Sequence, residues 1–184
     1  MKIESIGTSG RLFTVADLLS EQDSELLQTL DWASLPWIRQ SGQESWSRRL
    51  ITDEAAAPYA ELINNAIPKI SENIRAELKA PYTRFWIDEP GFTVSIHTDG
   101  HLKASVQMFW LMPTDQHGTK FFNSKIPTDY LWDSVAKPNT GYVMLNKLND
   151  DGSQPLHWHG MLNPVPPNCL RVTSYTVFSD YEIK

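Results

Sequence analysis

The stretch Phe92–His101, "FTVSIHTDGH", joins the pattern of a β-strand to groups that bind metal ions. Apolar and polar residues alternate from Phe92 to His97, which is the period of a half-buried strand. Alternate side chains of a strand share one face, so His97 and Asp99 point the same way. An isolated His-x-Asp pair is more often a hydrogen bond at a strand end. A further histidine would complete the two-histidine, one-carboxylate site that suits non-haem Fe(II).

Strand patterns extend on both sides of this stretch, from Tyr82 to the end of the chain. Turn residues separate the apolar runs, which read "YTRFWI", "FTVSIH", "ASVQMFWLM", "GTKFF", "DYLW", "GYVMLNKL", "LHWHGML" and "CLRVTSYTVF". Short strands at this spacing are typical of a sandwich or barrel. No helical crossover lies between them, so we expect mostly antiparallel sheets.

The chain before Tyr82 is predicted to be helical. Ser20 and Asp23 form a capping-box-like start for one helix, and isoleucines three or four residues apart indicate a second helix over residues 53–80. Pro68 should kink this second helix or split it. Residues 32–50 have no clear period and are interpreted as a loop or an irregular strand. We expect one domain over residues 1–184, with a helical part at 1–80 and a β core at 82–179.

Composition narrows the class of protein. A chain of 184 residues with 41% hydrophobic residues is large enough for one packed core. No stretch has the apolar length of a membrane span, and the first residues lack the apolar core of a secretory signal. The single cysteine, Cys169, fits a reducing cytoplasm. A net charge of −6 makes bulk nucleic acid an unlikely partner.

A second pair of histidines, His157 and His159 in "HWHG", precedes the last strand pattern. Both share one face of a strand, so periodicity does not choose between them. The turn "PVPPN" is centred near Val165, with His159 and Arg171 six residues away on either side. His159 then lies at the depth of Arg171, which favours His159 as the third ligand. His157 would then contact the metal ligands without binding the metal itself, or it would line the pocket.

Arg171 and Thr173 share a face of the last strand pattern. A guanidinium on an otherwise apolar strand is costly to bury without an anionic partner. Its fork of N–H groups matches a carboxylate. The strand therefore predicts an anion site facing the interior.

The ordered set His97-x-Asp99, His159 before Pro164-Val165, and Arg171-x-Thr173 resembles the Fe(II)/2-oxoglutarate-dependent oxygenase superfamily. The resemblance covers residues 82–179 by motif, and the helices before the strands look like its prolyl-hydroxylase-like branch with short phage and bacterial members. It implies a mainly β fold. That fold is a double-stranded β-helix (a jelly roll, cupin-like) with N-terminal helices packed on one sheet.

The resemblance also implies the chemistry. Catalysis and metal binding fall on His97, Asp99 and His159, and Arg171 with Thr173 would bind the far carboxylate of 2-oxoglutarate. The cofactors would be Fe(II), 2-oxoglutarate as co-substrate, and O2. The reaction would hydroxylate a substrate and release succinate and CO2. Related halogenases have a small residue in place of Asp99, so its presence favours hydroxylation or a similar oxidation.

Other residues carry weaker expectations. Gln107, in the middle of a strand pattern, either contacts the 2-oxo acid or substrate, or faces an edge. Tyr175 continues the face of Arg171 and either closes the co-substrate pocket or packs in the core. Arg84 and Trp86 either face the pocket or are a surface arginine and a core tryptophan.

Two segments are candidate lids, residues 117–141 and residues 32–50, the latter with Trp37 and Trp46. His101 and His117 lie in turn-like contexts and are expected to face solvent. The substrate is a small molecule or a protein side chain that the sequence does not identify, and the sequence does not indicate the oligomeric state. Two rivals remain, a cupin-like metal enzyme that does not use 2-oxoglutarate and a non-catalytic metal-binding barrel.

Overall fold

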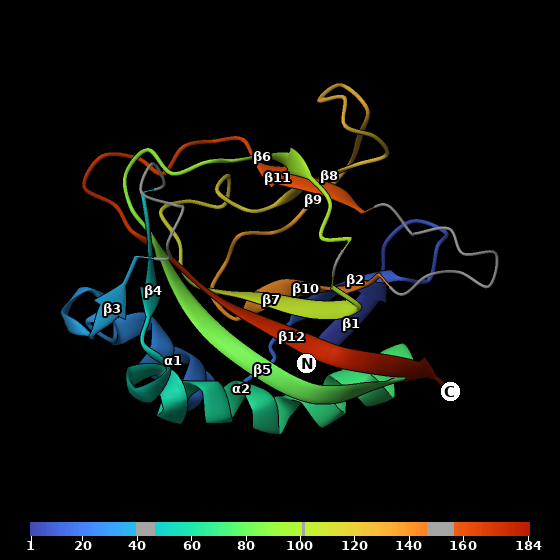
Figure 1. Ribbon diagram of the computed structural model, residues 1–184, viewed down its shortest axis with the longest axis horizontal. Coiled ribbons are helices and arrows are strands. Elements are labelled where there is room, and N and C mark those ends of the chain that lie inside the picture. The colour runs from blue at the N-terminus through green and yellow to red at the C-terminus, as the bar shows by residue number, and fades with distance from the viewer. Residues whose placement is uncertain (40–46, 101, 147–156) are drawn as a thin grey trace.

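A computed structural model describes residues 1–39, 47–100, 102–146 and 157–184 of the chain. Two β-sheets face each other, and two helices cover the outer face of the larger sheet (Figure 1). The elements are β1 (Lys2–Ser5), β2 (Leu12–Ala16), α1 (Glu21–Thr29), the 3-10 turn η1 (Trp32–Ser34), β3 (Trp37–Ile38), β4 (Arg48–Ile51), α2 (Asp53–Ile74), β5 (Ala76–Asp88), β6 (Val94–His97), β7 (Ala104–Leu111), β8 (Lys120–Phe122), β9 (Tyr130–Asp133), β10 (Thr140–Leu145), β11 (Trp158–Met161) and β12 (Arg171–Ile183).

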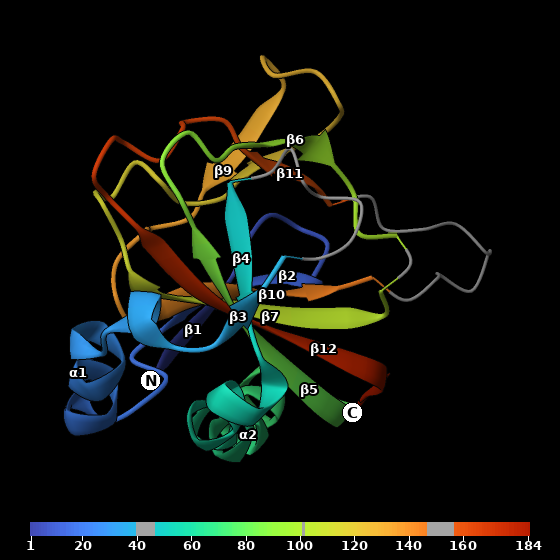
Figure 2. The ribbon, with the colours of Figure 1, turned by 60° about the vertical axis from the view of Figure 1, so that its left-hand side comes forward.

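Strands after α2 alternate between the two sheets, except that β8 and β9 pair with each other in the small sheet. The large sheet has the order β1-β2-β10-β7-β12-β5-β4-β3, and the small sheet has the order β6-β11-β8-β9. Each strand pairing between described residues is antiparallel. This alternation produces a double-stranded β-helix, which confirms the predicted mainly β fold. Seen from another side, the strands of the large sheet fan out below the small sheet (Figure 2).

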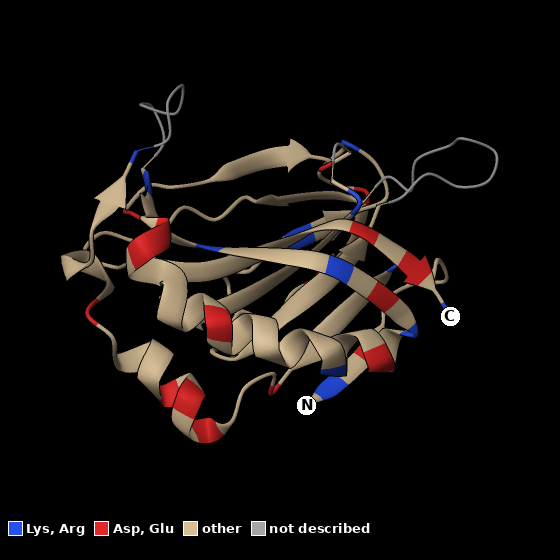
Figure 3. Ribbon diagram, turned by 60° about the horizontal axis from the view of Figure 1, so that its bottom comes forward, with Lys and Arg blue, Asp and Glu red and all other residues tan. Residues whose placement is uncertain are grey.

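Helix α2 packs on β5 through one apolar stripe, which confirms that helices cover one sheet. Its buried isoleucines recur at helical spacing and join the core of the large sheet with Phe85 and Ile87. The hydroxyl of Thr52 accepts from the backbone N–H of Ala55 and caps the helix start. The first turns of both helices carry acidic residues, which suits the positive end of a helix dipole (Figure 3).

The structure corrects the expected course of the second helix. Of the two outcomes predicted at Pro68, a split does not occur, because the helix continues through this exposed residue as one element; a kink there stays a prediction. The helix also does not extend to residue 80. Arg75 adopts the left-handed conformation (φ 52°) and ends the helix, so that Leu78 belongs to β5 instead. The isoleucine period therefore ran past the helix into a strand with its own buried residues.

The first 80 residues are also less helical than predicted, because they contain β1, β2, β3 and β4. These strands have two to five residues each, and β1 and β3 form the two edges of the large sheet. Short edge strands bury little surface and show no strong alternation. Strand β4 covers part of the segment that was interpreted as a loop or an irregular strand. Residues 40–46 of that segment, including Trp46, lie outside the described residues.

Register across the large sheet decides which side chains meet inside the barrel. On β12, Arg171 lies opposite Asp88 of β5, and Tyr175 lies opposite Gln107 of β7. Asp88 in turn lies opposite Arg48 of β4. Opposite residues in a sheet share a face, so this inner face presents arginine, carboxylate, amide and phenol groups to the small sheet.

Candidate functional site

His97, Asp99 and His159 converge at the small sheet. His97 ends β6, Asp99 lies two residues beyond it, and His159 lies on β11 directly opposite His97. One ligand atom from each residue lies within 4.8 Å of the other two. Asp99 Oδ1 is 3.3 Å from His97 Nε2, and Asp99 Oδ2 is 3.6 Å from His159 Nε2. Two imidazoles and one carboxylate at this spacing can hold a divalent cation.

Backbone contacts fix both imidazoles in the tautomer that binds metal. His97 Nδ1 is 2.8 Å from the carbonyl oxygen of Ser95, and His159 Nδ1 is 2.8 Å from that of His157. A carbonyl oxygen can only accept, so Nδ1 carries the proton in both rings. When the ring is neutral, each Nε2 then has a lone pair on the side of Asp99. A donated Nδ1–H is the usual support of a metal-binding histidine.

Electrostatics favour an anionic Asp99 and a neutral His159, whereas they favour the protonated form of His97. Burial alone would raise the pKa of Asp99, but contacts with His97, His159 and Tyr175 lower the pKa to about 2. Burial lowers the pKa of His159, whereas the hydrogen bond with Asp99 raises the pKa of His97. At neutral pH, Asp99 is therefore an anion and His159 a neutral ligand.

The structure separates the two late histidines. His159 lies with His97 and Asp99, whereas His157 is outside this group and contributes only its carbonyl oxygen. Burial lowers the pKa of His157 to about 4, so that its ring is neutral. Gly160 lets β11 approach β6, because a Cβ atom there would lie 2.8 Å from the carbonyl oxygen of Val94.

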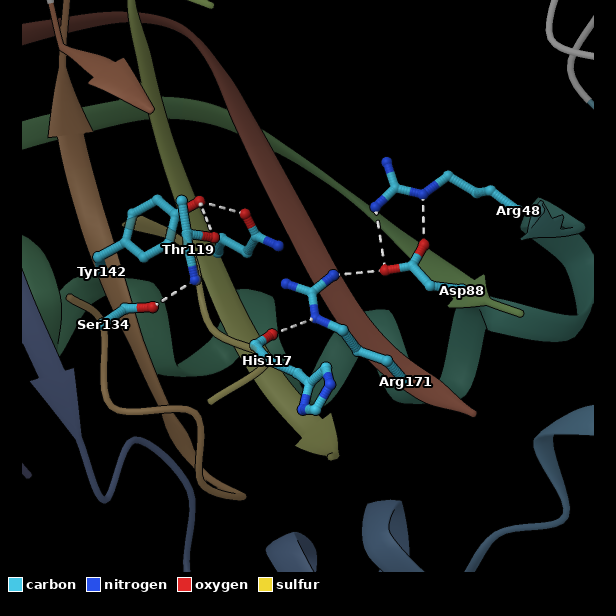
Figure 4. A network of polar contacts seen from close by, with 8 residues as sticks. Arg48, Asp88, His117, Thr119, Ser134, Tyr142 and Arg171 are labelled. Carbon is cyan, nitrogen blue, oxygen red and sulfur yellow. Dashed lines mark hydrogen bonds and ion pairs between the residues drawn. The ribbon is translucent and has the colours of Figure 1, made fainter. Parts of the chain in front are cut away.

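A cavity of about 200 Å³ lies between two groups of residues. His97, Asp99 and His159 line one end, and Arg171 and Thr173 line the other. Arg171 is 1% exposed, and its Nε donates to the backbone carbonyl of His117 at 3.0 Å. Its Nη1 donates to Asp88, while the other Nη points toward the side where Tyr142 and Thr119 lie (Figure 4). The hydroxyl of Thr173 is buried and has no hydrogen-bond partner among the described residues. Arg171 and Thr173 thus leave polar groups directed into the cavity.

Gln107 and Tyr175 both line the cavity, but the structure gives them protein partners. The Gln107 side-chain oxygen accepts from the hydroxyl of Tyr142. The Tyr175 hydroxyl donates to Asp99 Oδ2 at 2.5 Å. Tyr175 therefore supports the carboxylate of the metal group, a contact that the sequence did not indicate.

The sequence analysis missed three residues that line the cavity, Arg48, Thr119 and Tyr142, and also missed Asp88, which accepts from Arg171. Each lies far in sequence from the partner that reveals it. Arg48 and Asp88 are 40 residues apart, and Tyr142 meets Gln107 across 35 residues and Thr119 across 23. Asp88 ends a strand just before a turn, which was the only local signal for its role.

His117 was wrongly expected to face solvent. It is 7% exposed, and its ring contacts Thr114 and the carbonyl of Pro164. His101 lies outside the described residues. Strands β8 and β9 lie within the candidate lid at residues 117–141, where the patterns "GTKFF" and "DYLW" predicted them. A lid function of this segment stays a prediction.

Trp86 faces the cavity, while Arg84 is not among the residues that line it. The guanidinium of Arg84 lies 4.8 Å from the ring centroid of Tyr82. Of the two alternatives predicted for Trp86, the structure therefore supports the one in which it faces the pocket.

Comparison with known proteins rests on structure alone. No protein-family model matches the chain, and no curated protein matches it in sequence. The viral collagen prolyl hydroxylase of Paramecium bursaria Chlorella virus-1, solved as a 2-oxoglutarate complex, has a TM-score of 0.58 at 13% identity, covering 91% of this chain and 94% of its own.

One protein from Streptomyces and one from Micromonospora share the same architecture. HygX from Streptomyces hygroscopicus, solved with nickel and 2-oxoglutarate bound, has a TM-score of 0.58 at 7% identity, covering 91% of this chain and 82% of its own. EvdO2 from Micromonospora carbonacea has a TM-score of 0.65 at 12% identity, with coverages of 98% and 95%. The chain therefore has the double-stranded β-helix fold of the 2-oxoglutarate-dependent oxygenases.

Proposed function

We propose that the protein is an Fe(II)- and 2-oxoglutarate-dependent dioxygenase. The observation that carries the proposal is a single cavity with a two-histidine, one-carboxylate group at one end and Arg171 with Thr173 at the other. The reaction converts a substrate C–H bond, O2 and 2-oxoglutarate into the hydroxylated substrate, succinate and CO2. The substrate is a small molecule or a protein side chain.

The residues present fit the metal. Two neutral imidazole nitrogens and one carboxylate oxygen are ligands that suit Fe(II), and they leave other coordination positions open. Bound Fe(II) would supply the oxidising chemistry by activating O2 together with the 2-oxo acid. His97, Asp99 and His159 hold the ion, and the Tyr175 hydroxyl holds Asp99 in place.

The far end of the cavity fits a carboxylate. Some N–H groups of Arg171 donate to no described residue. The Thr173 hydroxyl is buried and also has no hydrogen-bond partner among the described residues. A buried hydroxyl without a partner is costly, so this one indicates a missing ligand. A ligand carboxylate accepts from Arg171 and Thr173 at once, which orients the co-substrate toward the metal end.

Two rivals make different predictions. A cupin-like metal enzyme needs the metal group but has no use for Arg171 and Thr173 as a carboxylate site. A non-catalytic barrel binds metal, with or without 2-oxoglutarate, and shows no turnover. The paired sites in one cavity favour the oxygenase over both.

Succinate formation tests the proposal. The purified protein, loaded with Fe(II), is incubated aerobically with 2-oxoglutarate and pools of small molecules and peptides, and succinate is measured. We expect succinate that depends on both Fe(II) and 2-oxoglutarate and that rises with one class of substrate. The matched control is Asp99→Ala, which removes the carboxylate ligand.

The outcomes separate the rivals. Iron binding without 2-oxoglutarate binding, measured by calorimetry, favours the cupin-like metal enzyme. Binding of both without succinate from any pool favours the non-catalytic barrel.

A further inference from the structure

Arg48, Asp88 and Arg171 form one row across three neighbouring strands. Asp88 of β5 lies opposite Arg48 of β4 on one side and opposite Arg171 of β12 on the other. Its Oδ1 accepts from Arg48 Nε at 2.5 Å, and its Oδ2 accepts from Arg48 Nη2 at 3.2 Å and from Arg171 Nη1 (Figure 4). Asp88 is fully buried, and the side chain of Arg48 is 15% exposed. One carboxylate thus holds two arginines beside the cavity.

The row carries one net positive charge. If Asp88 faced Arg171 alone, the two charges would cancel, and a ligand carboxylate would meet a neutral pair. Arg48 offsets Asp88, so Asp88 can fix the orientation of Arg171 without removing the charge that attracts an anion. In a poorly solvated cavity, such a charge has a large effect on ligand affinity.

Arg48 does not reach toward the same place as Arg171. Two of its nitrogens are held by Asp88, and its guanidinium lies 5.0 Å from the ring centroid of Trp86 and 4.2 Å from that of Phe92. Both arginines line the cavity, but in Figure 4 the remaining nitrogen of Arg48 points away from Arg171, and the free nitrogen of Arg171 points away from Arg48. Arg48 therefore acts on a ligand of Arg171 through Asp88 and through its charge.

We propose that Arg48 and Asp88 are positioning residues that keep the anion site of Arg171 oriented and at one net positive charge, which matches one carboxylate. This inference rests on the proposed function, because the ligand is the far carboxylate of 2-oxoglutarate. The proposal gives Arg48 a role in 2-oxoglutarate affinity. Arg48 lies on β4, outside the strands that carry the metal-binding and Arg171-x-Thr173 motifs.

The test is calorimetric binding of 2-oxoglutarate to the Mn(II)-loaded protein without O2. Arg48→Met makes the row neutral and should weaken binding roughly tenfold to a hundredfold. Arg48→Lys keeps the charge and should stay within a few-fold of the wild type. The double variant Arg48→Met with Asp88→Asn restores one net positive charge and should recover most of the affinity lost in Arg48→Met. Equal losses in Arg48→Lys and Arg48→Met would overturn the charge argument, even if the double variant does not fold.

Two controls isolate the effect. Arg49→Met removes the same charge from the neighbouring residue. Because Arg49 pairs with Glu89 on the other face of the strand, 2-oxoglutarate affinity should not change. The probe 2-oxopentanoate lacks the far carboxylate, so Arg48→Met should not weaken its binding. If wild-type protein binds Mn(II) but no 2-oxoglutarate, the proposed function fails. If the wild type binds it and Arg48→Met binds equally well, only the present inference fails.

Discussion

Replacing Tyr175 with phenylalanine removes one hydroxyl and leaves the ring that lines the cavity. That hydroxyl donates to Asp99 Oδ2 at 2.5 Å, the oxygen that is also 3.6 Å from His159 Nε2. A hydrogen bond to a charged group contributes about 1.5–3 kcal/mol. Because 1.36 kcal/mol corresponds to one pKa unit, its loss should raise the pKa of Asp99 by roughly one to two units.

This rise leaves Asp99 ionised. Its pKa starts at about 2, so the variant carboxylate still carries its charge at pH 7. Any loss of metal affinity in Tyr175→Phe must then come from a carboxylate that is no longer held in place. Removing an outer hydrogen bond to a metal ligand typically costs ten- to a hundredfold in affinity.

Calorimetric titration with Mn(II) at pH 7 measures this loss. We expect the dissociation constant to rise about ten- to a hundredfold in Tyr175→Phe, with an unchanged melting temperature within a few degrees. Tyr142→Phe is the matched control. It removes a hydroxyl from the same cavity that bonds Gln107 and Thr119 rather than the metal group, and it should leave Mn(II) affinity nearly unchanged. A folded Tyr175→Phe protein with wild-type affinity would refute the reasoning.

Four further results are expected. Asp99→Ala should lose most Fe(II) affinity, measured by metal content after dialysis, and should abolish succinate formation while the fold stays intact. Arg171→Ala should raise the KM for 2-oxoglutarate by tens- to thousands-fold, since truncating one side of a buried charge pair costs about 2–5 kcal/mol, and Arg171→Lys should recover part of the loss. His159→Ala should abolish iron-dependent succinate formation at saturating Fe(II), whereas His157→Ala should only reduce it; the reverse ranking would make His157 the ligand. Mn(II) affinity should fall as the pH drops through the pKa of His97, which the contact with Asp99 raises, because a proton then competes for Nε2; a flat profile between pH 6 and 8 would contradict this.

The metal end and the anion end of the cavity lie on different sheets. The metal group lies on the small sheet, and the arginine row lies on the large sheet. The cavity between the sheets separates them by the thickness of the barrel interior. A bifunctional ligand that chelates the metal and ends in a carboxylate suits such a cavity.

One structural finding bears on the prediction that no stretch of the chain has the apolar length of a membrane span. Within the described residues, no helix is both long and apolar enough to span a bilayer.

The sequence by itself determined the strand-rich core and the residue types at both ends of the cavity. Alternation around His97 and Asp99 and the shared face of Arg171 and Thr173 are local properties, because side-chain direction in a strand repeats every two residues. The same period could not choose between His157 and His159, since both lie on one face.

Tertiary structure decided the contacts between distant strands. His159 is set beside His97 by the β6–β11 register, and Asp88 receives Arg48 and Arg171 because β4 and β12 flank β5. A strand pattern states which face a side chain takes but not which strand lies next to it, because pairing depends on the packing of the whole barrel. For that reason the sequence indicated an arginine in need of an anion, and only the fold revealed the second arginine and the carboxylate that hold it.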